Sequence, residues 1–299
     1  MKRAVSVSLG SSKRNKRVTI TLGETTIQVE RIGTDGDTLK AKQMFEDLDG
    51  QVDAFGIGGV DLYLRLDKRE YPLRAALKLV QGVHYTPIVD GRGLKHTLER
   101  RVFERSASQL PPDLSFQRAF IPVAADRLGL AHAIEEKSDR VDIGDLMVAL
   151  GIPIVVPGIA AYHRLARILF PIVSHFPMRL LYYGSDGREP TPKYHTQWQQ
   201  ADLWAGDFLF MRKHMPLDLS GKAIVTNTTT SQDVDLLRQR GARFVLTTTP
   251  RYEGRSFGTN LMEAALTAYA GKGRPLTSLE LNALIDDLDL RPHIEHLNS

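Results

Sequence analysis

The amino-acid sequence predicts an α/β protein whose C-terminal half forms a Rossmann-like, mostly parallel sheet. Two segments carry this prediction, residues 222–230 and 243–251, because each is a short apolar run that ends in threonines before a helix-like stretch. The N-terminal half opens differently. Residues 5–9, 17–22 and 26–32 alternate apolar and polar side chains, a pattern typical of an antiparallel β meander.

The first half is predicted to be an N-terminal α/β domain over residues 1–110. Leu110-Pro-Pro-Asp113 breaks the helical pattern and separates this domain from a Rossmann-like domain over residues 114–299. After the meander, the expected elements are a helix at 37–48 capped by Asp37, strands at 52–59 and 60–66, a helix at 71–80 and a strand at 86–90.

The second half is predicted to begin with a strand at 116–124 and a helix at 125–136. It continues with a turn-rich segment at 139–145 and a βαβ unit (152–156, 160–170, 178–183). It ends with helices from 231, 261 and 277 and a tail that contains His293 and His296. The pattern at 201–214 fits strand and helix equally well. If its first part is a strand, Asp207 lies at the strand's end and joins the ligand edge.

Composition excludes several kinds of chemistry. The 299 residues are 42% hydrophobic and 25% charged, enough to bury a sizeable core. The absence of cysteine removes disulfides, thiolate metal ligands and cysteine nucleophiles. A net charge of +4 on a mixed surface does not indicate a nucleic-acid partner. No apolar run approaches the roughly 18 residues of a membrane span, so a cytoplasmic location without a membrane partner is expected.

Two polar turns near the N-terminus leave alternatives open. Residues 10–17 place four basic side chains beside glycine and serines, which suits either a phosphate or a solvated hairpin tip. Asp35 and Asp37 offer oxygens to a cation, but helix capping alone explains Asp37, and no metal site is predicted.

The turn after the strand at 86–90 is a candidate anion site. Asp90 ends that strand, and Gly91 and Gly93 expose backbone donors beside Arg92 and Lys95. Backbone donors with cations at a helix start suit an anionic ligand, although glycines are also expected in any strand-to-helix turn.

A second candidate site follows the two threonine-ended strands. Helix capping accounts for Thr230, for Asn260 through a capping-box pattern with Glu263, and for Thr277 through a Thr-x-x-Glu cap with Glu280. It leaves several polar residues unexplained. These residues, with Thr259 just before the helix from 261, are predicted to hold a small anionic molecule. The unexplained residues are Asn227, Thr228, Thr247, Thr248, Arg251, Arg255 and Ser256.

Several motifs taken together resemble the bacterial family named quinate 5-dehydrogenase. They are Gly33-Thr-Asp-Gly-Asp37, Gly58-Gly-Val-Asp-Leu-Tyr63, Val89-Asp-Gly-Arg-Gly-Leu-Lys95, Thr97-Leu-Glu-Arg100, Gly206-Asp207 and the two central units through Arg255-Ser-Phe-Gly-Thr-Asn260. The resemblance covers nearly the whole chain. It implies an oxidoreductase that uses NAD or NADP on a small hydroxylated carboxylic acid such as quinate or shikimate.

The same resemblance implies roles for particular residues. Quinate and shikimate dehydrogenases use a lysine and an aspartate around the alcohol that is oxidised, and Asp90 and Lys95 are the nearest candidates here. Arg251 and Arg255 would hold the carboxylate or a cofactor phosphate.

Two other readings of the sequence stay open. The opening strands, helix and glycine-ended strand resemble the actin-like sugar kinase half-domain, with Gly10-Ser-Ser-Lys13 at the phosphate-loop position, which implies a protein that binds a phosphorylated metabolite or a phosphotransferase. A non-catalytic metabolite sensor is the other reading. A homo-oligomer is compatible with all three.

Overall fold

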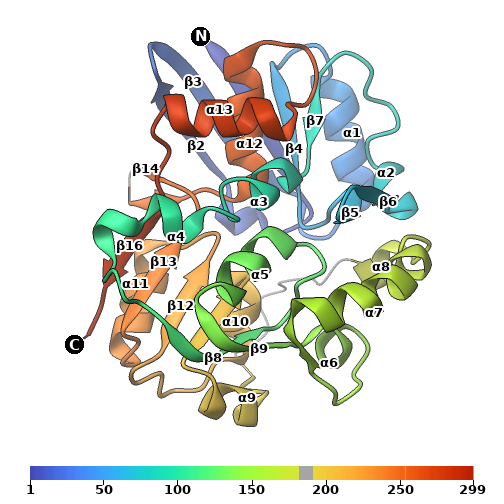
Figure 1. The fold of residues 1–299 in the computed structure, drawn as a ribbon. Coiled ribbons are helices and arrows are strands. Elements are labelled where there is room, and N and C mark those ends of the chain that lie inside the picture. Colours follow the sequence, from blue (N-terminus) through green and yellow to red (C-terminus); the bar gives the residue numbers. More distant parts are fainter. Residues whose placement is uncertain (182–190, 253, 299) are drawn as a thin grey trace. The chain divides into compact units, whose positions relative to one another are not determined.

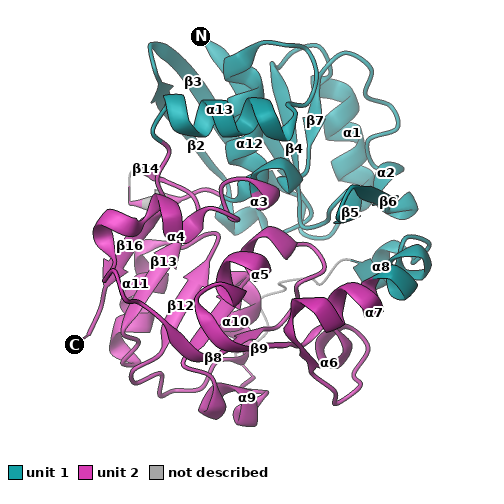
Figure 2. Cartoon of the chain, viewed as in Figure 1, with its two compact units in different colours: residues 1–94, 167–187, 258–289 teal, residues 95–166, 188–257, 290–299 magenta. Residues whose placement is uncertain are grey.

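The computed structural model describes residues 1–181, 191–252 and 254–298 (Figure 1). The chain divides into two compact units (Figure 2). Unit 1 comprises residues 1–94, 167–187 and 258–289, and unit 2 comprises 95–166, 188–257 and 290–299. This division differs from the predicted domains, 1–110 and 114–299, because the chain returns to unit 1 twice after residue 94. Proline-rich breaks mark local interruptions, whereas long-range packing decides which segments share a core.

Unit 1 is built on a five-stranded sheet with the order β2-β3-β1-β4-β7. The strands are β1 (Lys2–Ser8), β2 (Lys16–Leu22), β3 (Thr25–Gly33), β4 (Ala54–Gly58) and β7 (Ile88–Val89). The three opening strands are confirmed, and β2 and β3 form an antiparallel hairpin. However, β1 lies between β3 and β4 and is parallel to both. Five consecutive buried residues in β1 suit an interior strand, whereas the alternating exposure of β2 suits an edge.

The remaining small elements of unit 1 test several predictions. Helix α1 (Thr38–Leu48) is confirmed, and its predicted cap Asp37 accepts a hydrogen bond from the Lys40 backbone N–H at 2.9 Å. The prediction of a helix at 71–80 is wrong for the most part, since this segment is the end of a hairpin followed by one helical turn. The strand predicted at 178–183 is a helical turn as far as residue 181, and its last two residues lie outside the described part. These elements are β5 (Tyr63–Leu66), β6 (Arg69–Pro72), α2 (Arg74–Leu77), α3 (Arg92–His96) and α8 (Met178–Leu181).

Two late helices complete unit 1. Helix α12 (Thr259–Ala270) packs against β1, β3, β4 and β7, and nine of its twelve residues are buried. A Cβ atom on Gly56 would lie 2.7 Å from the Asn260 carbonyl oxygen, so glycine permits this close approach. Helix α13 (Ser278–Asp287) carries the predicted Thr277 and Glu280 capping box.

Unit 2 contains a seven-stranded sheet with the order β10-β9-β8-β11-β12-β13-β16. The five central strands are parallel, which confirms the predicted Rossmann-like sheet, and the two edge strands are antiparallel. The strands are β8 (Phe116–Ile121), β9 (Ser138–Ile143), β10 (Val156–Pro157), β11 (Leu203–Gly206), β12 (Ala223–Thr226), β13 (Phe244–Thr247) and β16 (His293–His296). A further short pair consists of β14 (Arg251–Tyr252) and β15 (Arg255–Ser256).

Three sequence predictions for unit 2 are wrong. The segment predicted as turns is strand β9, the strand predicted at 152–156 forms only the short antiparallel β10, and the predicted tail is strand β16. Pairing with a distant strand decides each case. The helices are α4 (Val102–Arg105), α5 (Leu128–Glu135), α6 (Asp145–Ala149), α7 (Gly158–Val173, which continues into unit 1), α9 (His195–Gln200), α10 (Phe208–His214) and α11 (Ser231–Gln239).

The core of unit 2 includes two tryptophans whose rings stack with centroids 3.5 Å apart, Trp198 and Trp204. Along the described chain, every helix is too short or too polar to cross a bilayer.

Candidate functional site

The carboxyl edge of the unit 2 sheet has a topological switch point. From β8 the chain passes through α5 to β9 on one side, and β11 later pairs with the other side of β8. Ligands of open α/β sheets bind outside the carboxyl ends of the strands at such a point. Asp126 and Arg127 lie between β8 and α5, and Asp207 directly follows β11.

A lysine and an aspartate meet at this edge. The Lys95 Nζ atom lies 3.1 Å from Asp126 Oδ2, and the lysine side chain is only 5% exposed while that of Asp126 is 29% exposed. Arg127 Nε lies 3.5 Å from the same oxygen. Burial by itself would raise the pKa of Asp126, but Lys95 and Arg127 outweigh it and leave the pKa below its usual value. Asp126 is therefore an anion that orients the lysine.

A second buried pair continues from Arg127. Its Nη1 atom donates to Glu99 Oε1 at 2.6 Å, and the Thr248 hydroxyl donates to the same oxygen at 3.1 Å. Glu99 is fully buried, and its other oxygen, Oε2, has no hydrogen-bond partner among the described residues. Thr248, predicted as a ligand contact, thus joins the end of β13 to a charged cluster that consists of Lys95, Asp126, Arg127 and Glu99.

Asp145 holds the loop that presents Asp126. It follows β9 and accepts hydrogen bonds from the backbone N–H groups of Ala124 and Ala125 at 2.7 and 3.1 Å, and from the Tyr162 hydroxyl at 2.8 Å. Burial raises the pKa of Asp145 to about 6, because these donors are neutral and only partly offset the loss of water. Asp145 positions the residues just before Asp126.

The turns after β11 and β12 contribute amide and hydroxyl groups. Asp207 accepts hydrogen bonds from the Leu209 and Phe210 backbone N–H groups and so caps α10. The Asn227 side-chain amide donates to Asp207 Oδ2 at 3.3 Å. The Thr228 side chain is half-buried and makes no hydrogen bond within the described part of the chain. Of the two predictions for residues 201–214, the one that began with a strand is confirmed by β11. Asp207 therefore lies at the end of that strand, as this prediction required.

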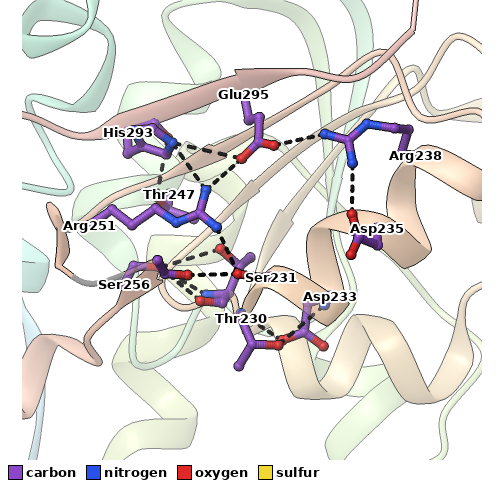
Figure 3. Close-up of polar contacts among 12 residues, drawn as sticks. Thr230, Ser231, Asp233, Asp235, Arg238, Thr247, Arg251, Ser256, His293 and Glu295 are labelled. Atoms are coloured by element: carbon purple, nitrogen blue, oxygen red, sulfur yellow. Dashed lines mark hydrogen bonds and ion pairs between the residues drawn. The ribbon is translucent and has the colours of Figure 1, made fainter.

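Arg251 has an internal partner (Figure 3). Its Nη1 atom donates to Glu295 Oε2 at 2.6 Å, and its Nη2 atom donates to the Ser231 hydroxyl at 3.3 Å. Glu295 also accepts from Arg238 at 2.8 Å. Because the predicted tail is strand β16, it brings this carboxylate to the guanidinium that was expected to hold a ligand anion. The ligand role of Arg251 stays a prediction, with a competing internal contact.

The other predicted ligand residues after β13 have structural contacts or lie outside the description. The Ser256 hydroxyl accepts from the Thr229 backbone N–H at 2.9 Å and is fully buried, so it joins two loops. The Arg255 side chain is not among the described atoms. Thr259 begins α12 in unit 1, where a Cβ atom on Gly91 would lie 2.7 Å from its hydroxyl oxygen. The predicted ligand set is thus divided between the two units.

Asp90 also lies in unit 1, and its carboxylate organises its own turn. It accepts hydrogen bonds from the Leu62 and Arg92 backbone N–H groups at 2.9 and 3.0 Å. The sequence placed Asp90 and Lys95 in one acid/base pair, whereas the structure pairs Lys95 with Asp126. Five residues of separation along the chain do not determine which carboxylate a lysine meets, because the partner comes from a different strand end.

Sequence reasoning missed a buried glutamate of unit 1. Glu263 Oε2 on α12 accepts a hydrogen bond from the Leu94 backbone N–H at 3.2 Å. Burial and the nearby charge of Asp90 raise the pKa of Glu263 to about 8. The capping-box pattern formed with Asn260 had assigned Glu263 a different role, but the cap of α12 has no side-chain hydrogen bond.

Sequence reasoning also missed Glu99, Asp126 and Arg127. Two signals could have found them: Glu99 follows Lys95 by four residues, the spacing of one helical turn, and the Asp126-Arg127 pair begins two residues after a predicted strand. In the basic turn at residues 10–17, two backbone N–H groups that could face a phosphate already have partners. Its Ser12 and Lys13 N–H groups donate to Asp35 and Ser11 side-chain oxygens.

Comparison with known proteins gives a family without an assigned activity. The family model described as domain of unknown function DUF8753 matches residues 3–90, and the one described as domain of unknown function DUF8754 matches residues 93–297. No curated protein matches the chain.

Solved structures show only distant likeness. An NAD-dependent malic enzyme from Thermotoga maritima has 10% identity and a TM-score of 0.38, covering 95% of this chain and 75% of its own. A Mycobacterium smegmatis protein in complex with β-D-fucofuranose has 10% identity and a TM-score of 0.34, covering 99% of both chains. Likeness at this level carries no conclusion about activity.

Proposed function

The chain belongs to the DUF8754 domain family, and we propose that it is an NAD(P)-dependent oxidoreductase that acts on a small hydroxylated carboxylic acid. The observation that carries the proposal is the ion pair between the buried Lys95 and the half-buried Asp126 at the carboxyl edge of a mostly parallel sheet, beside its switch point. The resemblance to quinate 5-dehydrogenases supports it, because quinate and shikimate dehydrogenases use a lysine and an aspartate around the reacting alcohol. Asp126 takes the role for which the sequence offered Asp90.

The residues at this edge fit the sugar part of a nicotinamide nucleotide better than its phosphates. The side-chain amide of Asn227 has two N–H donors and gives one of them to Asp207. Its second N–H and the hydroxyl of Thr228 suit ribose hydroxyls. In contrast, backbone N–H groups in the turns after β8, β11 and β12 already donate to the protein's own carboxylates, Asp145, Asp207 and Asp233. Asn227 and Thr228 are therefore the residues proposed to hold the cofactor.

Lys95 is proposed as the group that moves the alcohol proton. In its amine form, Nζ takes the proton from the substrate hydroxyl as the carbon–oxygen double bond forms, while a bound nicotinamide ring would accept the hydride from the same carbon. Asp126 accepts a hydrogen bond from Nζ and fixes its direction. The proton then leaves to water, so that alcohol and oxidised cofactor give ketone, reduced cofactor and one proton.

The test is a spectroscopic assay of nicotinamide reduction with a panel of hydroxy acids that includes quinate and shikimate. We expect turnover with NAD or NADP, and we expect Lys95→Met and Asp126→Asn to lower kcat by about 10²–10⁴-fold. Cofactor affinity, measured by calorimetry, should change little in both variants. The exposed Lys68→Met serves as the control and should keep full activity.

Two results would contradict the proposal. One is the absence of both nicotinamide binding and turnover in the wild type. The other is full turnover in Lys95→Met, which would remove the lysine from the reaction. Binding of a hydroxy acid without any turnover would instead favour the metabolite-sensor reading.

A further inference from the structure

Helices α7 and α8 expose large apolar side chains in unit 1. Ile168 is 67% exposed, Ile172 is 54% exposed, and Leu180 on α8 is 61% exposed. Ile168 and Ile172 are four residues apart and therefore share one face of α7. Phe170 lies on the buried side of the same helix, where its ring contacts Tyr71 at a centroid distance of 5.7 Å. The helix is thus apolar on both its inner and its outer face.

The charge of this stretch has one sign. Residues 158–181 contain three arginines and two histidines but no aspartate or glutamate. Among the described residues, the exposed Arg167 forms an ion pair with Asp67 at 3.5 Å, and both side chains are more than half exposed, so water screens the contact. Arg179 on α8 is also exposed. Cations therefore accompany the exposed isoleucines and leucine without acidic residues from the same stretch.

We infer that residues 167–181 are a membrane-contact surface that docks on an anionic lipid bilayer. An amphipathic helix that combines exposed aliphatic side chains with arginines lies in the bilayer interface, where acyl chains cover the apolar groups and anionic headgroups attract the cations. Such docking needs no spanning helix, and it departs from the sequence expectation that no membrane takes part.

Charge favours a bilayer over a second copy of the chain as the occupant. In a two-fold dimer the same patch would face itself, and arginines would approach arginines with no acidic residue of this stretch to meet them. An anionic lipid surface supplies the missing charge. The other exposed leucines of unit 1, Leu39 and Leu279, lie on helices that also carry acidic residues and therefore provide matched controls.

The experiment is co-sedimentation of the full chain with phosphatidylcholine vesicles, with and without phosphatidylserine. We expect the protein to sediment only with vesicles that contain phosphatidylserine, and to bind more weakly as the salt concentration rises. The double variant Ile168→Asp with Ile172→Asp should lower the partition coefficient by about tenfold or more. Arg167→Gln and Arg179→Gln should each lower it by about fivefold. Leu39→Asp should bind as the wild type does.

Thermal melting checks that the variants fold. We expect that they do, because the substituted side chains are exposed. The inference fails if the wild type stays in the supernatant with phosphatidylserine vesicles at low salt, or if the isoleucine double variant binds as well as the wild type. It also fails if light scattering shows a dimer that this double variant converts to a monomer, because a second copy would then occupy the face.

Discussion

In unit 2, the half-buried carboxylate of Asp126 faces cations, whereas in unit 1 the fully buried carboxyl of Glu263 faces another carboxylate. Asp126 lies 3.1 Å from Lys95 Nζ, and the pKa of Asp126 falls below its usual value although burial opposes this. Glu263 has backbone N–H donors and the charge of Asp90 nearby, and its pKa rises to about 8. Loss of water favours the neutral form of both carboxyls, so the charges that each one faces account for the opposite shifts.

Asp145 shows that the charge of the hydrogen-bond partner, and not the unit, decides the direction of the pKa shift. It belongs to unit 2, yet its pKa rises to about 6, because its hydrogen-bond donors are two backbone amides and a tyrosine hydroxyl. Neutral donors recover only part of the hydration that a carboxylate loses, whereas a cation can exceed it. A buried acid at a strand end is thus charged at neutral pH where a lysine or arginine faces it.

Removing a cation from unit 2 should give the largest effect. Arg127→Met leaves Glu99 buried without its charged partner, and we expect the free energy of unfolding to fall by about 3–5 kcal/mol. Chemical denaturation measures this. The double variant Arg127→Met with Glu99→Gln removes the stranded charge and should recover much of the loss. If the double variant is as unstable as Arg127→Met alone, the loss of stability comes from packing and not from an unpaired charge.

Replacing the titrating carboxyl of Glu263 with an amide should change how stability depends on pH. Below about pH 8 the folded protein keeps the Glu263 proton, whereas the unfolded chain releases it near its ordinary pKa of 4.5. The folded state thus binds more protons in this interval, and the free energy of unfolding falls as pH rises. From pH 5 to pH 8 the wild type should lose about 2–4 kcal/mol more than Glu263→Gln.

Denaturation of both Glu263 proteins at several pH values checks this difference. Parallel pH profiles would show that Glu263 is already ionised in the folded state. Asp126 should act in the opposite direction, since its lowered pKa means that stability is lost as pH falls through the acidic range. Asp126→Asn should flatten that acidic limb.

The smallest effect is expected at Arg251, whose partner is partly exposed. Glu295 keeps its contact with Arg238 when Arg251 is removed, so Arg251→Met should lower the free energy of unfolding by less than about 1 kcal/mol. The internal contact also predicts unchanged affinity for nicotinamide nucleotides and hydroxy acids in calorimetry. A clear loss of affinity would instead return Arg251 to the anion-binding role that the sequence suggested.

The sequence was sufficient for elements with strong local signals. The caps at Asp37, Thr230 and Thr277 mark helix starts correctly, and the apolar runs before the threonines are strands β12 and β13. The carboxyl ends of the parallel strands were also predicted to share one edge, and the sheet confirms this, whereas the ligand roles of Lys95 and of that edge stay predictions. These features depend on neighbouring residues, since capping and side-chain alternation act over a few positions along the chain.

Tertiary structure alone decided which groups meet. Asp126 reaches Lys95, Glu295 reaches Arg251, and Glu263 reaches the turn before Lys95 because strands and helices far apart in sequence pack together. Sheet order placed β1 between β3 and β4 and made a strand of residues 293–296. Local pattern specifies a strand but not its neighbour, because pairing depends on the burial and backbone hydrogen bonds that distant segments supply.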